Sequence, residues 1–341
     1  MEAFKFIKQI NEPSVEDCFD LYFNSPPHSL EKVQAVTQLR LNGMRFGFSP
    51  QERPVAYPIL MKFSYDYIRS PLMNESRFSH QIGLDLHRTV SNRDLSSELE
   101  ALLNTIIEQN PSLHYYQGLN DVSQFFLECL PVESAIKAME YILSHHLAPF
   151  AYKDMTYTQF MLLWIMEVIK KVKPSLFHRF NLSHFEPLKK GYFCLSWVIS
   201  WFLHDCNHPL VIDAIVSAPP SYIVYLAAAY TIKLVEKNLP PPKLEEDTDP
   251  EWYNDLVKSP ENFLPNNYRS VLDYAFEIMQ DHPPASFSEE FPQIFEAYPL
   301  MLNPLREKVV FNTTPAAMLT LASAGLVVTG AKLLHDFINN K

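Results

Sequence analysis

The apolar residues of this chain recur at the spacing of an α-helix, and this spacing constrains the fold more than any other feature of the sequence. In the clearest stretch they fall at positions i, i+3, i+4, i+7 and i+8, the pattern of one buried helical face. These residues are Leu99, Leu102, Leu103, Ile106 and Ile107. Ser97 and Glu100 fit a capping box at the start of this helix, and Pro111 should end it because proline has no N–H to donate. Similar stretches at 134–146 and 158–172, without sustained alternation of polar and apolar residues, predict an all-α fold.

Polar residues on either side of this helix are candidates for a functional site. Arg88 follows Asp85 by three residues, so on a helix the carboxylate can orient the guanidinium. Poor helix formers follow Arg88, which predicts that it lies near a helix end. Gln117 and Gly118 come after the break at Pro111 and before a second amphipathic run, which predicts a loop-to-helix junction. The spacing alone also fits a solvated arginine and a packing turn, so it does not establish chemistry.

These two segments resemble the two catalytic motifs of the TBC-domain Rab GTPase-activating proteins, I-x-x-D-x-x-R and Y-x-Q-G. The matching residues are Ile82, Asp85 and Arg88 in the first motif and Tyr115, Gln117 and Gly118 in the second. A third motif of the family, R-x-x-x-W-x-x-L, is matched upstream by the segment from Arg53 to Leu60. Tyr57 stands there in place of the tryptophan, and we expect it to keep an aromatic packing role.

The resemblance implies a TBC helical domain over residues 38–284 and, as partner, a Rab-family small GTPase in its GTP state. It implies that Arg88 stabilises charge on the transferred phosphoryl group and that Gln117 positions the attacking water. Supporting roles are implied for Ile82, Asp85, Thr89, Tyr115, Gly118, Asn120, Arg53 and Tyr57, with Asp121 as a further candidate. The nucleotide and Mg²⁺ belong to the Rab, so no cofactor or metal of the chain's own is implied. The alternative is a non-catalytic, membrane-anchored helical scaffold that binds a Rab or another partner.

Composition argues against several other classes of function. The chain has only seven glycines, and no glycine-rich phosphate loop can be assembled from them, so we do not expect it to bind the nucleotide itself. Its formal charge of −11 argues against nucleic acid and against docking on an anionic bilayer. The four cysteines form no C-x-x-C pair, which favours reduced cysteines in the cytosol. His204 and His208 have the spacing of zinc ligands, but Pro209 follows at once and no third ligand does, so capping or surface roles are expected.

The stretch from Phe193 to Leu203 is almost wholly apolar and carries Trp197 and Trp201 four residues apart. That spacing predicts that the two indoles share one face of a buried helix and pack in the core. Together with residues 113–118, residues 195–202 are most similar to the membrane-anchored branch of the family, which acts on early-secretory Rab proteins.

Residues 309–331 contain no charged side chain over 23 positions. Because about 20 helical residues cross the roughly 30 Å hydrocarbon core of a bilayer, this segment is predicted to be a transmembrane tail anchor. Residues 285–308 then form a connector, 332–341 a short tail, and 1–37 a lead-in to the domain. A buried or interfacial helix is the alternative, although the polar face that an interfacial helix needs is missing. With the resemblance, this anchor predicts a location on the endoplasmic reticulum or Golgi membrane, with the domain facing the cytosol.

Overall fold

The computed structural model describes residues 13–63, 72–89, 93–242 and 248–302, and within these ranges the chain is helical, with no strand. The helices of the amino-terminal half are α2 (Val15–Asn24), α3 (Leu30–Arg45), α4 (Arg53–Met61), α5 (Ser79–Thr89), α6 (Arg93–Gln109), α7 (Leu119–Cys129) and α8 (Val132–His145). The helices that follow are α9 (Thr156–Val172), α10 (Pro174–Leu182), α11 (Glu186–Lys189), α12 (Leu195–Ile199), α13 (Pro209–Ser217), α14 (Tyr222–Lys237), α15 (Asp249–Lys258), α16 (Pro260–Asp281) and α17 (Pro292–Ala297). Short 3-10 helices are η1 (Tyr192–Cys194), η2 (Pro284–Phe287) and η3 (Pro299–Met301). The predicted all-α fold is confirmed for the described residues.

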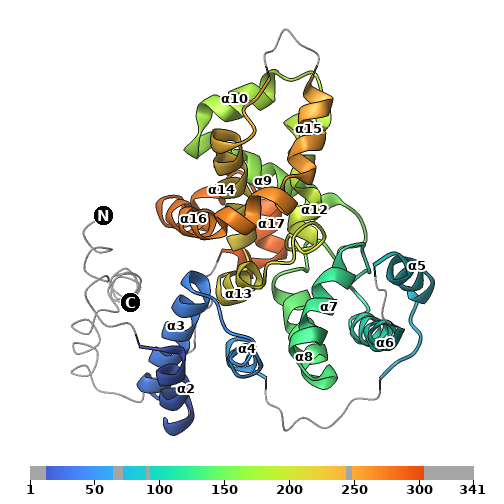
Figure 1. Ribbon diagram of the computed structural model, residues 1–341, viewed down its shortest axis with the longest axis vertical. Helices are drawn as coiled ribbons and strands as arrows, with labels where there is room; N and C mark the ends of the chain where they lie inside the picture. The colour runs from blue at the N-terminus through green and yellow to red at the C-terminus, as the bar shows by residue number, and fades with distance from the viewer. Residues whose placement is uncertain (1–12, 64–71, 90–92, 243–247, 303–341) are drawn as a thin grey trace.

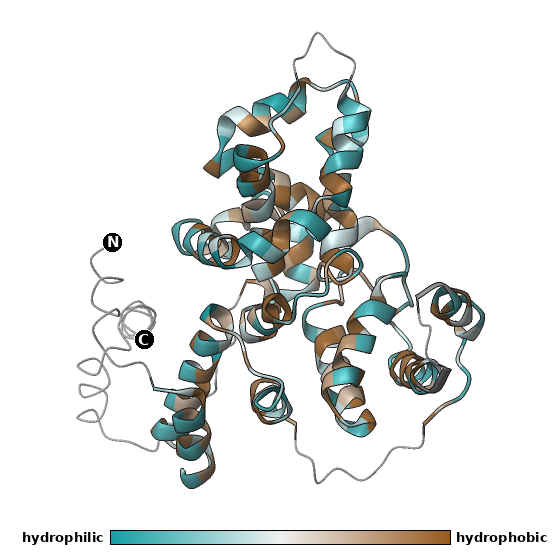
Figure 2. Ribbon diagram, in the orientation of Figure 1, coloured by the Kyte–Doolittle hydropathy of each residue, from teal (hydrophilic) through white to brown (hydrophobic). Residues whose placement is uncertain are grey.

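Helix α14 forms the centre of the carboxyl-terminal half. Every residue from Tyr222 to Ile232 is buried, and a helix that is apolar on all sides is typical of a domain interior. Helices α9 and α16 pack directly against it. The outer helices α2 and α3 instead carry both hydrophilic and hydrophobic residues along their length (Figure 2). These patterns explain why α14 is enclosed while α2 and α3 lie at the edge of the molecule (Figure 1).

Helices α5, α6, α7 and α8 pack against one another at the other end of the molecule from α10 and α15 (Figure 1). The five apolar residues that predicted α6 are all fully buried, and α6 ends at Gln109, two residues before Pro111. The predicted start of α6 is wrong, because the helix begins at Arg93 and Ser97 lies inside it. Leu95 packs against the core one turn before Leu99, so the apolar face continues beyond the predicted capping box.

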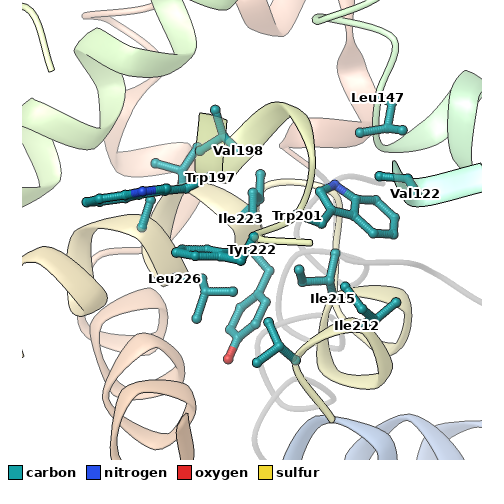
Figure 3. Close-up of a cluster of buried hydrophobic side chains, with 14 of the residues drawn as sticks. Val122, Leu147, Trp197, Val198, Trp201, Ile212, Ile215, Tyr222, Ile223 and Leu226 are labelled. Carbon is teal, nitrogen blue, oxygen red and sulfur yellow. The ribbon is translucent and has the colours of Figure 1, made fainter. Parts of the chain in front are cut away.

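The segment after α12 also differs from its prediction. Helix α12 ends at Ile199, so Trp197 and Trp201 do not share a helix face. Trp201 and Phe202 have φ values of 55° and 66°, a left-handed conformation that bulky residues rarely adopt. The predicted core packing of the two indoles is confirmed, since both are buried, on opposite sides of one apolar cluster (Figure 3).

Residues after α16 continue to pack on the domain. The rings of Phe287, Phe291 and Phe295 lie 5.0 to 6.3 Å from the ring of Trp164 in α9, and all four side chains are buried. Met301 is also buried, so the packed part of the chain extends past residue 284, where the domain was predicted to end.

The predicted membrane-spanning helix at 309–331 lies outside the described residues, as does the tail at 332–341. Among the helices that the structure describes, none combines the length and the apolarity needed to cross a bilayer.

Candidate active site

Helix α5 carries the first motif and is tied at its start to α6. The hydroxyl groups of Ser76 and Ser79 both donate to the side-chain oxygen of Asn104, over 2.7 and 3.0 Å. Ile82 is fully buried and therefore fixes which side of α5 faces the core. The motif residue Asp85 lies one turn later on the same side of the helix and is also buried.

Asp85 connects the two motifs. Its carboxylate accepts a hydrogen bond of 2.9 Å from the hydroxyl group of Tyr115, which is also buried. Burial and the Asp85 charge raise the pKa of Tyr115, so the phenol keeps its proton and acts as the donor. Arg88 lies in the last turn of α5, as predicted, and Thr89 is the final residue of that helix. The side chains of Arg88 and Thr89 lie outside the described part of the chain.

The residues between Tyr115 and α7 form the predicted loop-to-helix junction. Gly118 directly precedes α7 and has a φ of 109°, which favours glycine. A β-carbon at this position would lie only 3.3 Å from the side chain of Ile199. The Gly118 N–H donates to the side-chain oxygen of Asn120 over 3.0 Å, and Asn120 is buried. Gln117 is exposed just before this fixed turn, so its side chain is accessible to another surface.

A polar connection leads from this junction to the carboxyl-terminal half. The Asn120 amide donates to one oxygen of Asp121 over 3.0 Å, and the other oxygen lies 3.3 Å from Nδ1 of His204. Burial raises the pKa of Asp121, and the nearby His204 opposes that shift. The ring of His208 lies instead against Tyr268, with 4.2 Å between ring centroids. The two histidines therefore have separate partners, and His204 lies at the surface as expected.

The third motif lies in a separate, buried cluster centred on Asp213 of α13. Arg53 donates two hydrogen bonds to the Asp213 carboxylate, of 3.0 and 2.9 Å, and the Tyr57 hydroxyl donates a third of 2.6 Å. The backbone N–H of Phe48 adds a fourth of 2.9 Å. Burial alone lowers the pKa of Arg53, but the hydrogen bonds and charge of Asp213 outweigh it, so the pKa is raised and the guanidinium stays charged. The Tyr57 ring packs 5.4 Å from that of Phe126, which confirms its aromatic packing role and adds a hydrogen bond to it.

Sequence reasoning did not identify Asp213. Its signal is visible in the sequence, because Asp213 is the only ionisable residue in the apolar run from Pro209 to Ser217. A charge in such a helix requires a partner when it is buried. Those partners, Arg53 and Tyr57, lie 160 and 156 positions away in the chain, so no local pattern identifies them.

Two hollows on the described surface are lined by residues outside the two motifs. The larger, of about 600 Å³, is lined by residues that include Val15, Phe48 and Leu210. A smaller one, of about 80 Å³, lies beside α7 and is lined by residues that include Asp121 and Leu203. Small-molecule sites usually enclose about 300 to 1,000 Å³. The smaller hollow falls below this range, and the larger one is not lined by any residue of the turn before α7.

The chain matches the family described as the Rab-GTPase-TBC domain over residues 59–239. The GTPase-activating protein gyp10 of Schizosaccharomyces pombe is 31% identical over 172 residues, which cover 47% of this chain and 45% of that protein. TBC1 domain family member 20 of Bos taurus is 29% identical over 234 residues, which cover 64% of this chain and 55% of that protein. The chain therefore spans about half the length of these relatives. The TBC domain of Skywalker/TBC1D24 from Drosophila melanogaster has the same fold, with a TM-score of 0.53 and 13% identity over 85% of this chain and 96% of that one.

The matched range contains both motifs of the α5–α7 site, whereas Arg53 and Tyr57 precede it. It covers more than half of the 341 residues. This chain therefore belongs to the Rab-GTPase-TBC domain family.

Proposed function

We propose that this protein is a GTPase-activating protein for a Rab-family GTPase, and that Arg88 and Gln117 act in trans on GTP bound to that partner. The observation that carries the proposal is the hydrogen bond of 2.9 Å between Tyr115 and Asp85, which ties the two motifs together. Asp85 lies one turn before Arg88, and Tyr115 lies two residues before Gln117. Both candidate catalytic residues therefore lie within three positions in the chain of the same fixed contact.

The chemistry needs two groups that intrinsic GTP hydrolysis lacks. Charge that develops on the phosphoryl oxygens is poorly stabilised in an isolated GTPase, and the attacking water is poorly placed. The guanidinium of Arg88 presents a fork of N–H donors to those oxygens. The carboxamide of Gln117 can accept a hydrogen bond from the water and donate another, which orients it. The Rab partner brings the nucleotide and Mg²⁺, so the activator needs only to complete the site.

The proposal includes a membrane location for this activity. The uncharged segment 309–331 is long enough to cross a bilayer, and residues 195–202 resemble the branch of the family that acts on early-secretory Rab proteins. We therefore place the domain on the cytosolic side of the endoplasmic reticulum or Golgi membrane. Extraction of cell membranes with alkaline carbonate tests the anchor, because the full chain should stay in the membrane pellet and a chain without residues 309–331 should be released. Release of the full chain as well would contradict the anchor.

The activity is tested by single-turnover GTP hydrolysis with a panel of purified Rab proteins and the full chain. We expect acceleration of at least one Rab by the wild-type protein and its loss in both Arg88→Ala and Gln117→Ala. Gln51→Ala is the matched control, because Gln51 is an exposed turn glutamine outside the two motifs. A folded wild-type protein that binds a Rab but accelerates none would instead establish the non-catalytic scaffold.

A further inference from the structure

The end of α12 and the turn that follows it, residues 199–205, contact both chain neighbours of Gln117. Before it in sequence, the Tyr116 hydroxyl donates to the backbone carbonyl of Ile199 over 3.1 Å. After it, Gly118 lies so close to Ile199 that an added β-carbon would be 3.3 Å from that side chain. The position of Gln117 therefore depends on a segment about 80 residues away in the chain.

A series of hydrogen bonds connects the same turn to the backbone immediately after Gln117. It begins at His204, whose Nδ1 lies 3.3 Å from Asp121. Asp121 accepts a hydrogen bond from Asn120, and Asn120 accepts one from the N–H of Gly118, each of 3.0 Å. A change in the position of His204 can thus alter the position of the turn that presents Gln117, because three consecutive polar contacts connect them.

The core holds this turn in a conformation that its residues do not favour. Trp201 and Phe202 both have positive φ values. The Phe202 ring stacks on the Trp197 ring with a centroid separation of 5.8 Å. The backbone N–H of Phe202 donates to the backbone carbonyl of Trp197 over 2.8 Å. The buried Trp201 ring lies edge-on to His146 at 5.7 Å. Strained backbone of this kind persists only where the surroundings over-determine it, so the turn is a firm support for the residues that follow it.

The charges around Asp121 make its contact with His204 important. Burial raises the pKa of Asp121, and the neighbouring carboxylates of Asp85 and Asp205 raise it further. The Asp121 side chain is 12% exposed, whereas His204 is 49% exposed. A mostly buried carboxylate that loses one of its two partners is destabilised. We therefore expect the first turn of α7 to shift when His204 is removed.

We propose that His204 is a positioning residue for the glutamine finger, which fixes the turn that presents Gln117 through Asp121 and Asn120 without touching the nucleotide. The inference rests on the proposed function, since it concerns how Gln117 is held when it acts on Rab-bound GTP.

Single-turnover hydrolysis at increasing concentrations of the full chain tests this role. His204→Ala should lower the saturating rate constant about 10- to 100-fold, as expected for a small misplacement of a catalytic group. The half-saturating concentration should change by less than about twofold, because binding of the Rab is not affected. His204→Gln, whose amide can still donate to Asp121, should recover most of the loss. His178→Ala removes an exposed histidine of α10 and should behave as wild type.

A double-mutant comparison separates positioning from a merely structural role. In a Gln117→Ala background, His204→Ala should lower the hydrolysis rate by less than about a further twofold, because no glutamine remains to be positioned. Equal losses in the two backgrounds, or a change in half-saturation alone, would overturn the proposal. Asp121→Asn approaches the same contact from α7 and carries the test if His204→Ala does not fold. If the wild type accelerates no Rab, the proposed function itself fails, whereas an active wild type with an unaffected His204→Ala variant refutes only the positioning role.

Discussion

Two groups of motif residues lie in opposite surroundings in this molecule. At the α5–α7 site, Gln117 is exposed beside a fixed turn and Arg88 lies in the last turn of its helix. Around Asp213, the motif residues Arg53 and Tyr57 are buried, and all their polar contacts described above are with the protein itself. The comparison shows that a match to a family motif does not by itself tell whether a residue has a catalytic or a structural role. The burial of the side chain and its partners within the protein indicate which of the two roles it has.

The largest effect that separates the two groups is expected for Arg88→Ala. We expect it to lower the single-turnover rate by about 10³- to 10⁵-fold, because an arginine finger contributes stabilisation of that size to the transition state. Arg88→Lys should also fail, since an ammonium group lacks the planar fork of donors. The free energy of unfolding in urea titrations should stay within about 0.5 kcal/mol of wild type, because the proposed role of Arg88 is on the partner's nucleotide and not in the fold. Activity within tenfold of wild type would contradict a catalytic role.

The next largest effect is expected for Asp213→Ala, and it should be on stability. Removing one partner leaves the Arg53 guanidinium buried and unpaired, which costs about 3 to 5 kcal/mol. Urea unfolding measures this loss, with Asp20→Ala as the control, because Asp20 is an exposed acid of α2. The rate per folded molecule should be largely kept. A loss of stability below about 1 kcal/mol would show that the cluster does not support the fold.

His146 sharpens the comparison, because it is buried without the partners that Asp213 has. Among the described residues neither of its ring nitrogens has a hydrogen-bond partner. Burial, with smaller contributions from His145 and Arg40, lowers the pKa of His146 from 6.5 to about 3. The folded state therefore resists protonation, and stability should fall as the pH drops below 6.5 towards about 3.

The loss due to His146 should reach about 2 kcal/mol between pH 6.5 and pH 5, at 1.36 kcal/mol per pH unit. His146→Leu should remove this part of the pH dependence of unfolding, whereas the exposed-site control His178→Leu should not. Equal acid sensitivity of wild type and His146→Leu would show that another group titrates.

The smallest effect is expected for Tyr115→Phe, which removes the link between the two motifs. Loss of the hydroxyl leaves the buried Asp85 with one donor fewer and should cost about 1 to 2 kcal/mol in the free energy of unfolding. The hydrolysis rate should also fall, because the relative position of the two motifs is loosened. Tyr152→Phe is the matched control, because Tyr152 is a half-buried tyrosine outside the two motifs. A Tyr115→Phe variant with wild-type rate and stability would show that the hydrogen bond between Tyr115 and Asp85 contributes to neither.

Local patterns predicted the parts of the fold that depend on local rules. The buried face of α6, its end before Pro111 and the junction at Gln117 and Gly118 all follow from helical periodicity and from the conformations of proline and glycine. The start of α6 was misplaced because a serine–glutamate pair also occurs inside helices, and Leu95 extends the packed face.

Long-range contacts explain the features that local patterns missed. Asp213 finds its partners about 160 positions away, so the sequence shows a charge in an apolar helix but not what satisfies it. The left-handed conformation of Trp201 and Phe202 opposes their local preference and is fixed only by core packing. His204 was expected to be a surface histidine, and its contact with Asp121 depends on that unpredicted turn.

The central claim is that the α5–α7 site accelerates GTP hydrolysis through Arg88 and Gln117, and does not merely bind a Rab. Measurement of the affinity for the responsive Rab in two states, with GTP and with GDP plus aluminium fluoride, tests it most directly. A catalyst is complementary to the transition state, so the wild-type protein should bind the fluoride complex more tightly than the GTP complex, and Arg88→Ala and Gln117→Ala should lose that preference. Equal affinity of the wild type for both states would contradict the account and would leave this domain as a scaffold that binds a Rab without activating it.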